Sequence, residues 1–309
     1  MDAAIFGLIV ADLIAAPFDL RNPPAKGGLQ IVNNIKLTTG GNVCNTGVAM
    51  AKLGMKVAGA GLVGNDALGA AVSDQLKRSG MDISHVFSDA RAQTSATVVA
   101  VEPGGERCFY HVPGVTALLD GTSFRRCFPL FATCSIVQVG YLGLLPSLTP
   151  VLAGLLQEME TLYPNTKLAL DTVNPPGPAK DLWPILPHLD VFCPSRSEAQ
   201  ALTDESEPKK MIAAFREHMK TGLIGIKLDE EGCILDDGKE QVVAAIYRVD
   251  VKDTTGAGDT WYAGVLTALL KQMPLKQAAQ FANRAAADCC TDYGASAGVK
   301  SFEETMARL

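Results

Sequence analysis

The segment from Asp253 to Asp259 contains the residue types that phosphoryl transfer needs. Its Gly256-Ala257-Gly258 turn has small side chains, which allow a ligand to approach the backbone closely. A helix that begins here would point its unpaired N–H groups at that ligand, and the helix dipole would favour an anion. Asp259 adds a carboxylate beside this anion hole. A phosphate and a base held side by side fit the transfer of a phosphoryl group onto a hydroxyl.

A purely structural interpretation of the same segment is open. Asp259 could serve only as a helix cap, and the glycines could form only a tight turn. A glycine-rich turn by itself is a weak motif, so its surroundings must decide. The run from Ala244 to Val249 predicts a strand end before the segment, and apolar residues at helical spacing from Thr260 to Gln272 predict a helix behind it.

The composition excludes several classes of function. The chain has 309 residues, 48% hydrophobic and 19% charged, which is typical of a globular enzyme. A net charge of −6 without any basic run argues against nucleic acid and against an anionic membrane as partners. Eight cysteines without a Cys-x-x-Cys and four dispersed histidines predict neither a disulfide framework nor a zinc site. The apolar N-terminus, Ala3 to Ala16, lacks the basic region of a secretory signal, and no stretch reaches the ~20 apolar residues of a membrane span, so we expect a cytoplasmic protein.

Polar residues recur at the carboxyl ends of predicted strands. Asp12 follows the apolar run from Ile5 to Val10, and Asp171, Ser195 and Lys227 follow later runs. Because the carboxyl ends of parallel strands meet at one edge of a sheet, these side chains would line a single crevice. For Asp12, ordinary turn chemistry remains an alternative.

A second predicted helix start lies between Thr38 and Asn45. Its glycines and amides suit a neutral polyhydroxy ligand, and Gly54 is well placed to end the helix. Asn42 or Asn45 could equally be a cap and nothing more.

A small separate sheet is predicted from alternating residues. The runs Ala96 to Val101 and Arg107 to Tyr110 flank a hairpin signal at Pro103-Gly104-Gly105-Glu106. Together with Leu29 to Ile35 they would form a lid over the crevice. From Ile136 onward strand and helix signals alternate, which favours an α/β fold with a parallel sheet.

A dinucleotide-binding oxidoreductase is the alternative from another class. Gly59 to Gly64 matches G-x-G-x-x-G, a predicted helix follows from Ala67 to Leu76, and Asp82 lies near the spacing of a ribose-binding acid. However, such a fingerprint normally occupies the first strand–helix turn of its unit, and Asp66 would stand close to the pyrophosphate.

The whole pattern resembles the ribokinase-type (PfkB) family of carbohydrate kinases, over essentially the whole chain. The stretch DTTGAGDTWYAGVL, which starts at Asp253, fits the C-terminal signature of the family at every constrained position. In the N-terminal signature Gly40, Gly41 and Asn45 are in place, whereas Val43 departs from the usual small residue.

The resemblance implies one domain over residues 1–309 with a ribokinase-like three-layer α/β/α fold, a mostly parallel central sheet and a small β-sheet lid. The lid strands would come from about 14–38 and 92–111, and the nucleotide-binding half from about 165–309. The implied activity is ATP-dependent, magnesium-requiring phosphorylation of a hydroxymethyl group on a small sugar.

The resemblance also assigns roles to individual residues. Asp259 would be the general base, with Gly256, Ala257 and Gly258 as the anion hole. The sugar would be held by Asp12, Gly41 and Asn45, with Thr97 and Phe109 from the lid. The nucleotide side would comprise Asn174, Glu198, Lys227 and Asn283, with Glu198 also organising Mg²⁺ through water. Asp253 and Thr255 resemble a monovalent-cation (K⁺) site.

Three departures keep alternatives open. Ser195 replaces the Asn of the Asn-x-x-Glu motif, and Asp229 would bring a negative charge near ATP, so a non-catalytic sugar sensor is one alternative. No acidic residue follows Val139-Gly140, where some ribose-specific relatives have one, so the substrate could be another sugar or a nucleoside, as in an adenosine-type kinase.

The predicted lid also bears on the oligomeric state. An exposed lid with free strand edges predicts a homodimer.

Overall fold

A nine-stranded sheet forms the centre of the computed structural model, which describes residues 1–102 and 107–309. Neighbouring strands are parallel except at one edge of the sheet, where two successive pairings are antiparallel. The first strand of the chain pairs with a parallel strand on either side and so lies inside the sheet. In spatial order the strands are β13 (Gln241–Ala244), β12 (Cys233–Asp236), β11 (Leu223–Lys227), β10 (Val191–Phe192), β9 (Lys167–Leu170), β8 (Ile136–Gly140), β1 (Ala3–Gly7), β4 (Val57–Gly64) and β5 (Asp82–Asp89).

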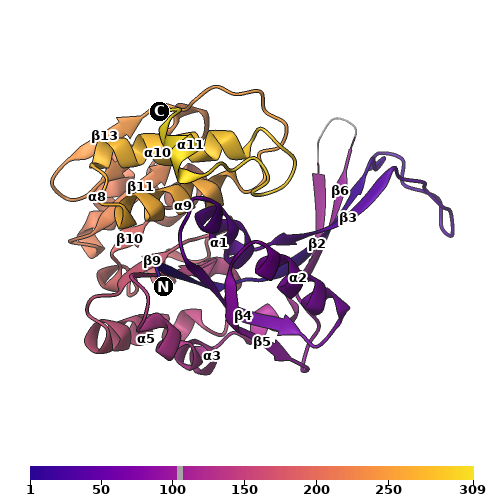
Figure 1. Ribbon diagram of the computed structural model, residues 1–309, viewed down its shortest axis with the longest axis horizontal. Helices are drawn as coiled ribbons and strands as arrows, with labels where there is room; N and C mark the ends of the chain where they lie inside the picture. Colours follow the sequence, from indigo (N-terminus) through magenta and orange to yellow (C-terminus); the bar gives the residue numbers. More distant parts are fainter. Residues whose placement is uncertain (103–106) are drawn as a thin grey trace.

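Helices cover both faces of this sheet (Figure 1). One face packs against α1 (Asn42–Lys52), α2 (Ala67–Arg78), α9 (Ala257–Leu270), α10 (Leu275–Cys289) and α11 (Phe302–Met306). The other packs against α3 (Gly121–Arg126), α4 (Phe128–Phe131), α5 (Thr149–Leu162), α6 (Ala179–Leu182), α7 (Arg196–Thr203) and α8 (Pro208–His218). Short 3₁₀ turns lie at Gly114–Leu118, Leu142–Leu144, Leu186–His188 and Asp229–Glu231.

Strand β1 shows why the sheet needs cover on both sides. Ala4 and Phe6 belong to one hydrophobic core, whereas Ala3 and Ile5 belong to the other. All four are fully buried, as expected for an apolar strand inside a parallel sheet. The Phe6 ring meets that of Phe124 edge-on, with 5.0 Å between centroids. The predicted three layers, with a mostly parallel sheet in the middle, are therefore confirmed.

A second sheet of four strands projects from one side of the molecule (Figure 1). Its spatial order is β3 (Asn34–Gly40), β2 (Val10–Ala16), β6 (Ala96–Val101) and β7 (Arg107–Val112). We call this sheet the lid. Strand β2 pairs antiparallel with β3 and parallel with β6. The predicted hairpin turn, Pro103 to Glu106, lies outside the described residues.

The predicted strand from Ile5 to Val10 is present inside the central sheet as β1, but its predicted end, with Asp12 at the carboxyl edge of that sheet, is wrong. Strand β1 ends at Gly7, and Asp12 lies within lid strand β2, opposite Thr97 of β6. The reason is that the residues between the two strands are buried as well, so hydrophobicity continues through the change of sheet.

A buried amide holds this crossing from one sheet to the other. The side chain of Asn42 accepts from the N–H of Leu8 through Oδ1 at 2.8 Å and donates through Nδ2 to the carbonyl of Phe6 at 3.0 Å. Its side chain makes no cap hydrogen bond to α1, so the cap interpretation of Asn42 is also wrong.

Two other predicted strands have different boundaries. Strand β13 is Gln241–Ala244, so the run from Ala244 to Val249 is loop apart from its first residue. Leu29 and Ile31 are 87% and 85% exposed in a loop, and β3 begins only at Asn34. Apolar alternation in a segment rich in Pro and Gly is therefore not evidence of a strand.

Candidate active site

The loop before α9 combines a glycine turn with a helix start, as the sequence predicts. Helix α9 begins at Ala257, and Gly256 precedes it with φ of +73°. A Cβ on Gly256 would lie 2.3 Å from the carbonyl oxygen of Ala295. Both the backbone angle and the available space therefore require glycine at this position.

The first turn of α9 presents two backbone donors. The N–H of Ala257 is already used, because it donates to the carbonyl of Thr254 at 3.2 Å. The N–H groups of Gly258 and Asp259 have no partner within residues 1–102 and 107–309. Since a helix N-terminus carries partial positive charge, these two groups are suited to bind an anion.

Lys227 adds a cation beside this helix start. Its Nζ lies 3.5 Å from Oδ1 of Asp171 and would lie 3.8 Å from a Cβ on Gly258. Burial alone would lower the pKa of Lys227, but the charges of Asp171, Glu198 and Asp259 raise it above its usual value. The amine is therefore charged at neutral pH and faces any anion held by α9.

Three side chains donate to the carboxylate of Asp259. Asn45 Nδ2 donates to Oδ2 at 3.0 Å. The hydroxyl of Tyr141 donates to Oδ1 at 2.6 Å, and that of Thr46 donates to the same oxygen at 3.4 Å. The sequence had placed Asn45 and Asp259 in one site, and the structure brings them together. Tyr141 is not predicted from the sequence, because it lies 118 positions from Asp259 and no local signal connects the two.

Two carboxyl groups of the site have raised pKa values. Burial raises the pKa of Asp259, whereas hydrogen bonds from Tyr141 and Asn45 and the charge of Lys227 lower it. Burial also raises the pKa of Asp171, to about 7, against the lowering effect of Lys227. A carboxylate with a raised pKa is a stronger base, which suits a group that takes up a proton.

Glu198 both begins a helix and faces the pocket. Its Oε2 accepts from the N–H of Ser195 at 2.9 Å and from the hydroxyl of Thr172 at 2.8 Å. The hydroxyl of Ser195 in turn accepts from the N–H of Glu198 at 3.3 Å, which completes a capping box for α7. Ser195, where the family has Asn, is thus the N-cap of α7.

A pocket of about 880 Å³ lies in front of the α9 start, a volume typical of ligand sites. Its wall contains many of the predicted residues, namely Gly256, Ala257, Gly258, Asp259, Glu198, Lys227 and Asn283. Asp229 also lines it and has a left-handed backbone, with φ of +53°. The exposed Asn174 is not among the lining residues, although its neighbour Val173 is.

The amide of Asn283 is engaged within the protein. Its Nδ2 donates to the carbonyls of Ala244 and Ala245, each at 2.9 Å, and its Oδ1 accepts from Nε1 of Trp261 at 2.8 Å. Both amide hydrogens are thus used. Asn283 therefore shapes the pocket wall and has no N–H left for a nucleotide.

Asp253 ties the loop before α9 to the loop after α10. One of its carboxylate oxygens accepts from the N–H of Thr255 and the other from the N–H of Gly294, both at 2.9 Å. No group of three or more His, Cys, Asp or Glu that could hold a metal ion occurs in the described part of the chain. A monovalent cation at Asp253 and Thr255 would thus share oxygens with backbone donors.

The lid places Asp12, Thr97 and His111 side by side on one face. Asp12 is opposite Thr97 in the register, and Thr97 is opposite His111, with 3.1 Å between Oγ1 and Nδ1. Burial raises the pKa of Asp12 to about 6, and the Thr97 hydroxyl lowers it in part. Phe109 lies on the same face, opposite Val99, and is 64% exposed.

The lid carboxylate and Asp259 both lie near the first turn of α1. Cys44 of that turn is buried, and its pKa is raised to about 12 by burial and by the charges of Asp12 and Asp259. Gly41 precedes the helix, and Asn45 follows on its first turn. The structure thus gathers four of the predicted site residues around one helix start.

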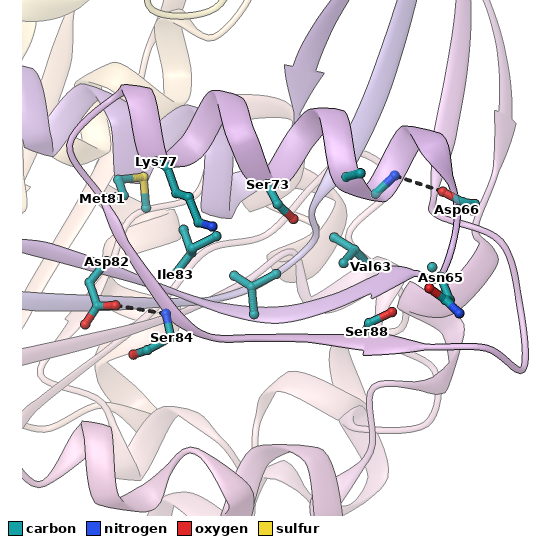
Figure 2. A pocket seen from close by; sticks show the side chains of 14 residues that line it. Val63, Asn65, Asp66, Ser73, Lys77, Met81, Asp82, Ile83, Ser84 and Ser88 are labelled. Atoms are coloured by element: carbon teal, nitrogen blue, oxygen red, sulfur yellow. Dashed lines mark hydrogen bonds between the residues drawn. The ribbon is translucent and has the colours of Figure 1, made fainter.

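The Gly59–Gly64 motif does not form the predicted glycine turn. All six residues lie inside strand β4, where every residue is buried. Figure 2 shows the neighbouring groove of about 650 Å³ between α2 and β5, with Asp66 and Asp82 at opposite ends. Asp66 caps α2 by accepting from the N–H of Gly69 at 2.8 Å. A carboxylate therefore occupies the helix start that a pyrophosphate would need, which removes the basis of the oxidoreductase alternative.

The comparisons with known proteins agree with the kinase interpretation. The model of the pfkB family of carbohydrate kinases matches residues 2–301. The chain belongs to this family. Ribokinase from Haemophilus influenzae is 27% identical over 313 residues, which cover 98% of this chain and 96% of the relative. Probable fructokinase-5 from Arabidopsis thaliana is 28% identical over 280 residues, which cover 83% of each chain.

Solved structures of ribokinases share the fold. The Arabidopsis thaliana ribokinase complexed with ribose and ATP has a TM-score of 0.83 at 20% identity, covering 99% of this chain and 97% of that one. Ribokinase from Giardia lamblia also has a TM-score of 0.83 at 20% identity, covering 100% and 99%. The predicted ribokinase-like fold is therefore confirmed. As a pfkB member the chain is an ATP-dependent sugar kinase, which confirms the predicted enzyme class.

Among the described residues, the helices of this sugar kinase are too short or too polar to cross a membrane.

Proposed function

We propose that this sugar kinase transfers the terminal phosphoryl group of ATP to a hydroxymethyl group of a small neutral sugar, with Asp259 as the general base. One observation carries the proposal. The buried carboxylate of Asp259 lies in the first turn of α9 within the 880 Å³ pocket, close enough to Lys227 for that charge to lower its pKa. A base and an anion site in one pocket are what phosphoryl transfer to a hydroxyl requires.

On the phosphate side, the N–H groups of Gly258 and Asp259 and the amine of Lys227 would hold the transferring group. Gly256 supplies the left-handed turn that aims the helix start, and Ala257 has no side chain large enough to block it. Such preorganised donors stabilise the charge of the transition state.

Glu198 fits a water-mediated contact to Mg²⁺. It lines the pocket, and its Oε2 is held in place while no described residue donates to Oε1. Mg²⁺ keeps several waters and uses one or two carboxylates together with substrate phosphates, so one fixed carboxylate suffices. When bound, the ion would neutralise charge on the phosphates. Potassium at Asp253 and Thr255 is a further part of the proposal, checked by comparing kcat in potassium and sodium buffers.

On the acceptor side, Asp12, Gly41 and Asn45 would bind sugar hydroxyls, with Thr97 and Phe109 contributed by the lid. Amides, hydroxyls and one carboxylate around a helix start suit a neutral, hydroxyl-rich molecule. The relatives named ribokinase and fructokinase indicate a pentose or a hexose.

We also propose that the lid pairs with that of a second copy. Its strands have free edges, and apolar side chains gather on the face opposite to Asp12, where exposed patches mark interaction sites. The exposed members are Ile35 (67%), Val98 (41%), Tyr110 (66%) and Val112 (38%). Tyr110→Asp should therefore convert a dimer to a monomer in sedimentation velocity, whereas Val243→Asp, on the edge strand β13, should leave it dimeric. A wild-type monomer at all concentrations would reject the dimer.

The deciding experiment measures ADP release with ATP and magnesium over a panel of pentoses, hexoses, their phosphates and nucleosides. We expect the highest kcat/KM with a neutral pentose or hexose. A nucleoside as the best substrate would favour a nucleoside kinase instead. Sugar binding in calorimetry without ADP release from any compound would favour a non-catalytic sensor and overturn the proposal.

A further inference from the structure

The hydrogen bonds around Asp259 make its two carboxylate oxygens unequal. A carboxylate oxygen has two lone-pair positions. Those of Oδ1 are both occupied, by the hydroxyls of Tyr141 at 2.6 Å and Thr46 at 3.4 Å. Among residues 1–102 and 107–309, Oδ2 accepts from Asn45 alone, at 3.0 Å, which leaves its second position open. The oxygen that can still accept a hydrogen bond is therefore Oδ2.

We propose that Tyr141 is a positioning residue for phosphoryl transfer: its hydroxyl holds Oδ1 of Asp259, so that Oδ2 receives the proton of the acceptor hydroxyl. Tyr141 follows the central strand β8, whereas Asn45 and Thr46 come from α1, so the carboxylate is fixed from two sides. The inference rests on the function proposed above and names the atom at which its proton transfer takes place.

The step balances without any further reactant. A lone pair of the acceptor oxygen attacks the terminal phosphorus of ATP, and the bond from that phosphorus to the bridging oxygen breaks with ADP as the leaving group. The acceptor proton moves to Oδ2 of Asp259. Tyr141 keeps its own proton throughout, because burial and the nearby charges of Asp259 and Asp171 raise its pKa well above the usual value.

The charged and titratable groups described around Asp259 lie on, or directly after, six elements: α1, β8, β9, α7, β11 and α10. Among the effects that lower its pKa, the Tyr141 hydroxyl is the largest, ahead of Asn45 and Lys227 of β11. Asp171, after β9, has a pKa of about 7 and is influenced in turn by Glu198 of α7. The thiols of Cys44 (α1) and Cys289 (α10) have pKa values raised to about 12 and about 11 and stay neutral. Removal of the Tyr141 hydroxyl should therefore raise the pKa of Asp259 and leave it protonated over a wider range.

Tyr141→Phe tests the role at nearly constant volume. Because less Asp259 is ionised at a given pH, the acidic limb of kcat/KM should move to higher pH. At pH 6 we expect kcat/KM to fall about tenfold, the effect of losing one hydrogen bond to a charged group, with a smaller fall at pH 8.5. Tyr262→Phe is the matched control. This buried tyrosine lies on α9 together with Asp259, and its hydroxyl donates to the carbonyls of Leu170 and Val191. Loss of that hydroxyl should not shift the acidic limb of kcat/KM.

Carbon-13 NMR of the Asp carboxyl groups separates this inference from the proposed function, because it needs no turnover. The Asp259 signal is assigned by its loss in Asp259→Asn, and Asp171 is assigned in the same way. Tyr141→Phe should shift the Asp259 titration to higher pH by more than it shifts that of Asp171. An unchanged Asp259 titration, or a kcat that rises at every pH because the phenol had blocked the base, would overturn the role of Tyr141. Absence of wild-type kinase activity would instead count against the proposed function.

Discussion

The two sides of the site are built in opposite ways. The proposed phosphate side belongs to the body of the protein: Asp259 lies in the first turn of α9, where the next nine residues are all buried, and Lys227 lies at the end of a strand of the central sheet. The proposed acceptor side is shared with the lid, a four-stranded sheet that projects from one side of the molecule (Figure 1). There Phe109 and Tyr110 are 64% and 66% exposed.

This difference separates the reaction from the choice of substrate. Groups that must hold charge need fixed positions and exclusion of water, which the packed body supplies. Residues on a projecting sheet can change with little effect on the core, so specificity can vary there while the reaction is kept. Substitutions on the phosphate side should therefore reduce turnover, and substitutions on the lid should alter sugar affinity.

The largest effect is expected for Asp259→Asn. Loss of the proposed general base should lower kcat by at least ~10²-fold, while the sugar KM changes little. Steady-state kinetics with circular dichroism as a check on folding measures both. Near-normal turnover in the folded variant would contradict the proposal that the packed body supplies the residues for phosphoryl transfer.

The second-largest effect is expected for Lys227→Met. The variant removes the cation beside Gly258, so kcat/KM for ATP should fall roughly 10- to 100-fold, the range for a lost charge-assisted hydrogen bond. Lys271→Met is the control, because Lys271 lies over the Phe302 ring, 5.2 Å from its centroid, and does not line the pocket. Equal effects of the two variants would argue that lysine loss acts through stability alone.

Asp12→Asn should weaken the binding of the sugar and leave the binding of ATP unchanged. We expect the sugar KM to rise about tenfold, with the KM for ATP unchanged. Because the pKa of Asp12 is raised to about 6, its carboxylate is ionised above that pH and protonated below it. The wild-type sugar KM should thus increase as the pH falls through about 6, and the variant should lack this increase. A main effect on kcat would contradict the division between the two sides.

The smallest effect is expected for Asp229→Gly. Asp229 has φ of +53° and lines the pocket, so glycine should relieve backbone strain and remove a negative charge near the phosphates. The KM for ATP should fall about two- to threefold, consistent with a weak interaction between partly solvated charges. Asp229→Asn removes only the charge and separates the two causes. An increased KM in both variants would show that Asp229 assists nucleotide binding.

The same division decides what could be predicted from the sequence. The α9 start was predictable, because glycines, an acidic residue and helical spacing are local signals. Asp12 was assigned to the wrong sheet, since no polar residue marks the passage from β1 to β2. Tyr141 is 118 positions from Asp259, and nothing local connects the two. Asn283 lines the same pocket as Lys227, but its hydrogen bond to Trp261 depends on tertiary packing.

The amide of Asn42 sets a boundary for exchanging lids between family members. It binds the backbone of Phe6 and Leu8 where the chain leaves the central sheet, and it belongs to the helix that carries Asn45 and Thr46. A lid graft whose first segment starts after Leu8 and ends before Asn42, with a second segment for β6 and β7, would keep these bonds. A graft that starts within Phe6 to Leu8 could break these two hydrogen bonds. The N–H of Leu8 and the carbonyl of Phe6 would then be buried without a partner, which is costly. Substrate preference could then be transplanted as a module, with the catalytic helix start left untouched.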